Sequence, residues 1–174
     1  MSIPEFSRPL RADTIGGEPR SVEIDADAVE RAALAKRFEL IAIERLTASF
    51  TIRRDAAGVV ADGRVEADVT QACSVTGDPL ATGVDETVEL RFVEASDSGD
   101  DEVELGDDDL DVMPYDGAAI DLGEVAAETM ALALDPFPRG PGAEALLKAA
   151  GVMNEEETRP IGALAGLKDK LAGR

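Results

Sequence analysis

Three successive runs between residues 41 and 92 alternate apolar and polar side chains with a period of two. Such alternation is typical of long strands that bury one face and expose the other to water. The apolar positions are Ile41, Ile43, Leu46, Ala48, Phe50 and Ile52, then Ala61, Gly63, Val65, Ala67 and Val69, and finally Val84, Val88, Leu90 and Phe92. The first series keeps one face if a bulge follows Ile43. The pattern predicts three long antiparallel strands, joined by turns at 55–58 and 73–82.

Shorter elements are predicted on both sides of these runs. Residues 3–15 contain β-prone positions, and Pro9 among them indicates an edge strand. A second short strand is expected at 22–24 and a brief one at 111–113. A short helix is expected at 143–150.

Two longer helices are marked by capping pairs. Asp27 and Asp121 are each followed three residues later by Glu, the pattern of a capping box. We expect the first helix to end near Phe38 and the second to be stopped by Pro136. The side chains expected to face the core are Val29, Ala32, Ala33 and Leu34 in the first helix, and Leu122, Val125, Ala126, Thr129, Met130, Ala133 and Leu134 in the second.

Together these elements predict an α+β protein with an antiparallel sheet, open or barrel-like, that is packed by helices. Residues 1–150 are expected to form a single domain, which includes a mobile acidic loop at 96–111. Residues 151–174 are expected to form a linker and a flexible, amphipathic helical tail. A marginal helix of this kind forms on a partner, docks on its own domain or frays.

Acidic residues are concentrated in the middle of the chain. The 174 residues carry a formal net charge of −20. The first sixty-four hold eleven acids and ten bases, whereas residues 65–158 hold twenty-five acids and three bases. The last sixteen are basic, with four Lys or Arg against Asp169. A field of this sign and distribution repels phosphate backbones and attracts basic proteins.

The composition excludes several kinds of catalytic site. The chain has no His, so it holds no Ser-His-Asp triad, no Cys-His pair and no His-bearing zinc site. Its one cysteine, Cys73, cannot form an internal disulfide. The acidic run at 107–111 lacks the Gly and the Glu that an EF-hand loop requires. We therefore expect no metal and no cofactor. Among enzymes, the alternative that the composition still allows is a metal-dependent nuclease whose carboxylates hold the metal ion.

Targeting signals are not evident in the sequence. The first eleven residues lack the apolar run of a signal peptide. No stretch approaches the roughly 20 apolar residues of a membrane span. A cytoplasmic location without membrane contact is therefore expected.

Three segments carry a family resemblance. Residues 71–80 read QACSVTGDPL, residues 120–138 run from IDL to ALALDPFP, and residues 159–168 read RPIGALAGLK. In this order they resemble the C-x-x-C-x-x-P turn, the "IDL…E…LALP…P" helix and the terminal "NPFAALAALK" of the YceD family of large ribosomal RNA subunit accumulation proteins. Thr76 stands where many relatives have a second Cys, so a zinc site inferred for them does not carry over. Ile161 replaces the usual Phe of the tail.

The resemblance implies a non-enzymatic factor that large-subunit ribosomal RNA needs in order to accumulate, through ribosome assembly or rRNA processing. The acidity favours binding of a basic ribosomal or rRNA-processing protein, because affinity for RNA itself comes largely from Lys and Arg. Direct rRNA binding is the alternative, through the near-neutral N-terminal part or the basic tail. The contacts expected for a basic partner are Asp62, Glu66, Asp68 and Glu89 on the strands, Asp107, Asp108 and Asp109 in the loop, and Pro160, Ile161, Leu164, Leu167 and Lys168 in the tail.

Overall fold

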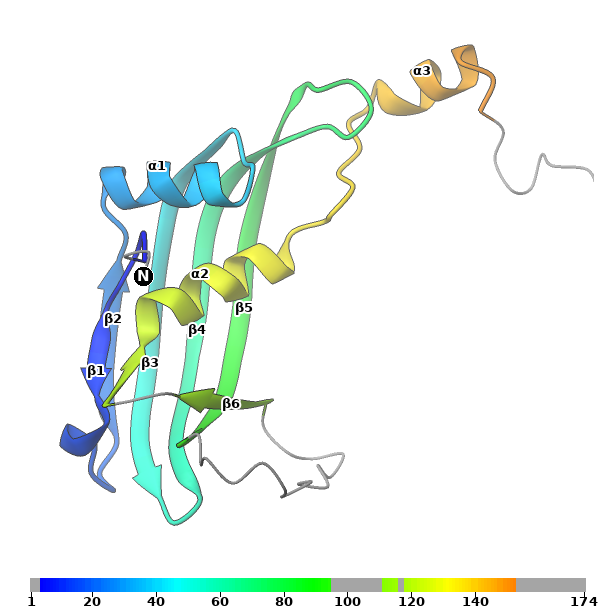
Figure 1. Cartoon of the computed structure of the whole chain (residues 1–174). Coiled ribbons are helices and arrows are strands. Elements are labelled where there is room, and N and C mark those ends of the chain that lie inside the picture. Colours follow the sequence, from blue (N-terminus) through cyan, green and yellow to red (C-terminus); the bar gives the residue numbers. More distant parts are fainter. Residues whose placement is uncertain (1–3, 95–110, 116–117, 153–174) are drawn as a thin grey trace, which may run out of the picture.

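The computed structural model describes residues 4–94, 111–115 and 118–152 (Figure 1). It is an α+β fold in which a curved five-stranded sheet, in the order β2-β3-β4-β5-β6, has helices on one face. The strands of this sheet are β2 (Arg20–Asp25), β3 (Ala42–Asp55), β4 (Gly58–Ala72), β5 (Pro79–Glu94) and β6 (Asp111–Tyr115). The predicted α+β fold class is confirmed. Over the described residues the sheet is open and does not close into a barrel (Figure 1).

The three long strands lie where the alternation predicts them. β3 pairs with β4 and β4 with β5, both antiparallel, and the register shifts between Ile43 and Arg45 at the expected bulge. The predicted inward positions from Ile43 onward are buried or partly buried, but Ile41 is 52% exposed. Ile41 precedes β3, so it is outside the pleat that orients the later side chains.

Two features of the sheet differ from the prediction. β6 runs parallel to β5 and pairs with its last five residues, Leu90 to Glu94, so the sheet is mixed and not wholly antiparallel. The brief strand expected before Pro114 continues through it, because a proline needs no ladder donor on an edge strand. The turn after β4 is also shorter than expected, since β5 begins at Pro79.

A second, two-stranded sheet joins the N-terminal segment to the residues that precede α2. β1 (Pro9–Arg11) pairs antiparallel with β7 (Ala119–Asp121), and a short 3-10 helix at Ala12–Thr14 follows β1. The edge character predicted from Pro9 is confirmed, because among the described residues β1 has a strand partner on one side alone. Pairing between segments more than a hundred residues apart leaves no local signal in the sequence.

Helix α1 (Ala28–Arg37) begins at the predicted capping box but turns a different face inward. Asp27 accepts from the amides of Val29 and Glu30, and the Glu30 side chain accepts from the Asp27 amide. The buried side chains are Leu34 and Ala35, whereas Val29 is 78% exposed. Two of the four predicted core positions, Val29 and Ala32, were therefore wrong, whereas Ala33 is partly buried. The helix packs on β3 through Leu34, which fixes its rotation.

Helix α2 (Leu122–Ala133) crosses the inner face of the sheet over β4 and β5 (Figure 1). Leu122, Val125, Ala126 and Met130 are buried as predicted. Gly123 and Ala127 are buried too, because the segment around Phe6 covers the other side of the helix. Of the predicted stripe, Ala133 is exposed, since it lies where the helix leaves the sheet.

Helix α3 (Ala143–Ala149) lies beyond the turn between β4 and β5 (Figure 1). Its one buried side chain is Ala143. No helix within the described residues is long and apolar enough to cross a membrane.

Candidate protein-binding groove

The outer face of the sheet carries the four acids that the sequence singled out on the strands. Two of them share one arginine: Arg45 Nε lies 2.8 Å from Asp68 and its Nη1 lies 3.6 Å from Glu66. One positive charge therefore offsets part of the charge of both exposed carboxylates. Exposed pairs of this kind contribute at most about 1 kcal/mol each to stability.

The other two acids, Asp62 and Glu89, lie directly opposite each other on β4 and β5. Like charges at directly opposed positions destabilise a sheet. No ion pair to either carboxylate is formed by the described part of the chain. Of the four predicted contacts, Glu66 and Asp68 are thus paired within the protein, whereas Asp62 and Glu89 can still pair with a basic group of a partner.

Arginines elsewhere are also engaged internally. Within the described residues seven arginines, Arg45 included, pair with carboxylates, and Arg31 and Arg54 donate to backbone carbonyls. The pairs are Arg8–Glu30, Arg11–Asp13, Arg37 with Glu5 and Glu124, Arg45 with Glu66 and Asp68, Arg53–Asp55, Arg64–Asp85 and Arg91–Asp55. Exposed cations that remain in the described ranges, such as Arg20, Lys36 and Arg139, lie on separate elements and form no patch.

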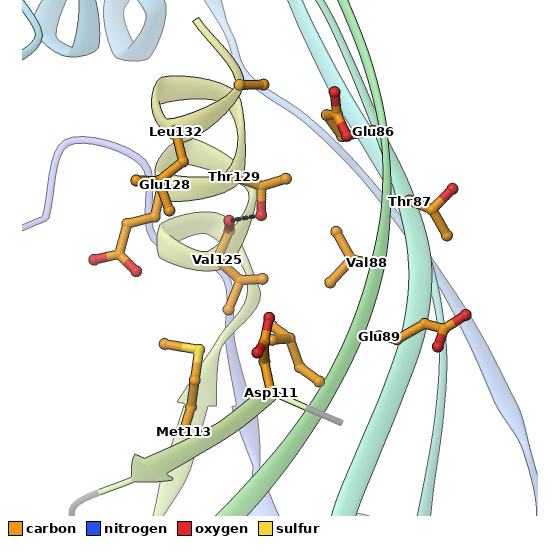
Figure 2. Close-up of a pocket in the computed structure, with 12 residues that line it drawn as sticks. Glu86, Thr87, Val88, Glu89, Asp111, Met113, Val125, Glu128, Thr129 and Leu132 are labelled. Carbon is orange, nitrogen blue, oxygen red and sulfur yellow. Dashed lines mark hydrogen bonds between the residues drawn. The ribbon is translucent and has the colours of Figure 1, made fainter. Parts of the chain in front are cut away.

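A groove of about 540 Å³ lies between β5, β6 and α2 (Figure 2). Val88 reaches from β5 toward Val125 of α2, and Met113 of β6 lies at one end. Leu132 of α2, 86% exposed, belongs to the same lining. An apolar floor with an exposed leucine at its lip is suited to apolar side chains of a ligand.

Four carboxylates are among the lining residues: Glu86 and Glu89 from β5, Asp111 from β6 and Glu128 from α2. Glu89 lies at the rim, because its side chain is directed to the outer face of the sheet, as is that of Thr87 (Figure 2). None of the twelve lining residues is basic. Burial, and then the neighbouring Glu124 carboxylate, raises the pKa of Glu128 above its ordinary value. Arg37 opposes part of this rise, but it is not among the lining residues. The lining of the groove is therefore acidic.

The sequence prediction missed Glu86, Asp111 and Glu128, which line this groove. Glu86 offered a signal, because it takes an inward position of the third run between Val84 and Val88. A charged side chain between two apolar inward positions indicates that this position is not covered by the core. Glu89 is the one predicted contact that also lines the groove.

The remaining predicted contacts cannot be placed. Asp107, Asp108 and Asp109 in the acidic loop lie outside the described residues, as do Pro160, Ile161, Leu164, Leu167 and Lys168 in the tail. The loop and tail interpretations therefore stay predictions.

The turn that holds Cys73 is built around the sulfur. The Gly140 amide donates to Cys73 Sγ at 3.3 Å, and the Ser74 amide donates to the Pro138 carbonyl at 2.8 Å. Donation from Gly140, and then from the Thr76 hydroxyl and nearby amides, lowers the pKa of Cys73 to about 6. Within the described residues no three His, Cys, Asp or Glu side chains are grouped so that they could hold a metal ion.

Fold and groove together define a small α+β protein with an open curved sheet and an acidic groove between the sheet and a helix. Residues 61–169 match the model of the family described as large ribosomal RNA subunit accumulation protein YceD. The chain belongs to this family, as its motifs predicted, and the match includes most of β4 and all of β5, β6 and α2. The family description assigns its members a role in the accumulation of large-subunit rRNA and names no reaction. Comparison with curated proteins gives no match, and comparison with solved structures gives none either.

Proposed function

We propose that the protein supports the accumulation of large-subunit rRNA as a non-catalytic assembly factor that binds a basic ribosomal or rRNA-processing protein. One observation carries this proposal. The groove between β5 and α2 combines an apolar floor with four carboxylates and has no basic lining residue.

A Lys- and Arg-rich segment complements such a groove in two ways. Its charges remove the repulsion among Glu86, Glu128 and their neighbours, and its apolar side chains cover Val88 and Leu132. Electrostatic complementarity also speeds encounter and disfavours acidic partners. The net charge of −20 extends this attraction over the whole molecule.

Direct binding of rRNA is the alternative, and the ion pairs weigh against it. RNA affinity depends on cations that neutralise phosphates and release counterions. Arginines such as Arg45 and Arg64 already neutralise carboxylates of the protein itself. Binding phosphate with them would expose those carboxylates to the RNA backbone.

Binding assays with the full-length chain test the two mechanisms side by side. The purified chain is titrated with large-subunit ribosomal proteins freed of RNA, and separately with protein-free large-subunit rRNA. We expect the proteins to bind at low ionic strength and to dissociate as salt is added, and the rRNA not to bind. Binding of rRNA alone, or its cleavage in the presence of Mg²⁺, would contradict the proposal.

A further inference from the structure

The groove runs beside a strand edge that is open in the described part of the chain. β4 covers one side of β5 along its length, but β6 covers the other side only from Leu90 to Glu94. Residues 79–89 of β5 thus have no strand partner there among the described residues.

The register shows which residues direct backbone groups out of this edge. The Cys73 amide donates to the Asp78 carbonyl at 2.8 Å, in the register that joins β4 to β5. The direction of N–H and C=O groups alternates along a strand, so even-numbered residues of β5 face β4. Backbone groups of the odd-numbered residues therefore point outward; these residues are Ala81, Gly83, Asp85, Thr87 and Glu89.

A strand added to this edge would alternate its side chains between the groove and the outer face of the sheet. On the groove side it would meet Val88 and Val125 at the floor and Glu86 and Glu128 beside them (Figure 2). On the outer side it would meet Glu89. Apolar side chains suit the floor and basic ones suit both flanks.

The same acids disfavour a second copy of this chain as the added strand. Between residues 79 and 89, β5 has Asp85, Glu86 and Glu89 and no basic residue. Pairing two such edges would bring like charges together, which destabilises a ladder. Charged edge residues of this kind are a known protection against self-association.

From this edge, this groove and this charge we propose that β5 binds its partner by strand addition. A basic, extended segment of the partner pairs with residues 81–89 and directs alternate side chains into the groove. The inference rests on the proposed function and specifies how the basic partner is held.

Hydrogen exchange of the full-length chain, with a nine-residue peptide of alternating Lys and Val as probe, tests this arrangement. We expect the peptide to slow exchange of the amides of Gly83, Asp85, Thr87 and Glu89. The amides of Glu86 and Val88 already face β4 and should change little. An alternating pattern of this kind is specific to a new strand on this edge.

Two controls separate backbone pairing from attraction by charge alone. Methylating the peptide nitrogens that face β5 keeps the charge but removes the donors, and should weaken binding by at least about tenfold. Replacing both Glu86 and Glu128 by Gln should weaken binding more than replacing Asp62 and Glu66, which lie on the outer face.

Each other outcome overturns the strand-addition proposal in an identifiable way. Peptide binding without protection in β5 rejects strand addition but leaves the basic partner intact. Lack of binding by both the peptide and the ribosomal proteins rejects the proposed function as well. If the odd-numbered amides of β5 were already protected in the free chain, its own tail would occupy the edge. If their protection rose with protein concentration, a second copy of the chain would occupy it.

Discussion

Gly63 of β4 is packed closely against Ser49 and Phe50 of β3. A Cβ atom there would lie 2.4 Å from the Ser49 carbonyl oxygen and 2.6 Å from a ring carbon of Phe50. Phe50 is 2% exposed, so its ring has no free space to enter. The absence of a side chain at position 63 thus leaves the space that the Phe50 ring occupies.

Gly63→Ala should therefore destabilise the protein, by about 1–3 kcal/mol as expected for overpacking. Urea unfolding followed by circular dichroism measures the change. Gly83→Ala is the matched control, since a Cβ atom at position 83 of the same sheet meets nothing within 4 Å. Equal losses of stability in the two variants would contradict this prediction. They would mean that replacing any strand glycine has this cost and that the close contact at Gly63 adds nothing to it.

Cys73 should titrate within the neutral range. Donation from Gly140, Thr76 and nearby amides lowers the pKa of the folded-state thiol to about 6, from an ordinary value of 9.0. Thiolate absorbance in the ultraviolet, taken as the difference between wild type and Cys73→Ser, should therefore rise near pH 6. In denaturant the same difference should rise near the ordinary value.

The lowered pKa of Cys73 also predicts the direction of a stability change. The unfolded chain binds the thiol proton more tightly, so folding releases it and stability rises with pH between about 6 and 9. The contribution is fully present above the unfolded pKa and is lost as pH falls through the folded one. Cys73→Ser should remove this part of the pH profile, and an unchanged slope would contradict the assignment.

At the scale of elements, Asp121 connects three parts of the fold. It caps α2 by accepting from the Gly123 amide at 3.0 Å. It also accepts from the Ser7 hydroxyl at 2.5 Å and the Arg8 amide at 2.7 Å. The start of α2 and the segment that covers it are therefore held by one carboxylate.

Asp121→Ala should cost about 2–3 kcal/mol, more than the roughly 1 kcal/mol of an ordinary helix cap. Thermal unfolding of the variant beside Asp27→Ala, which removes only the cap of α1, gives the comparison. Equal losses for the two variants would mean that the bonds to Ser7 and Arg8 add no stability.

Helices and strands that are marked by patterns among neighbouring residues were predictable from the sequence, but the elements against which they pair or pack were not. The period of two gave β3, β4 and β5, and the capping pairs gave α1 and α2, because these patterns depend on neighbouring residues. The pairing of β1 with β7 and the parallel course of β6 depend on contacts across the chain. The rotation of α1 was mispredicted because its alanines do not distinguish one face from the other.

The candidate groove was only partly predictable for the same reason. Acidity along β4 and β5 was visible, and Glu89 was among the predicted contacts. The groove itself exists because β6 leaves most of β5 uncovered while α2 crosses nearby. Asp68, equally acidic in sequence, lies elsewhere and is paired with Arg45, its cross-strand neighbour on β3.

At the scale of the whole molecule, charge acts on folding and on binding in opposite directions. A net charge of −20 on 174 residues opposes the compact state by self-repulsion. The same charge attracts a basic partner. Ion pairs such as Arg45–Asp68 and Arg64–Asp85 offset part of the repulsion locally, but exposed pairs are worth at most about 1 kcal/mol each.

Added salt should therefore stabilise the free protein and weaken its complex. Between 0.01 M and 0.15 M NaCl the Debye length falls from about 30 Å to about 8 Å, which screens repulsion across the molecule more than it weakens short ion pairs. We expect the Tm measured by calorimetry to rise over this range, while the affinity for the basic peptide falls. An uncharged osmolyte at equal osmolality is the control, because it cannot screen charge. If salt lowered the Tm, ion pairs would dominate stability; if salt left affinity unchanged, apolar contacts with the groove floor at Val88 and Val125 would dominate binding.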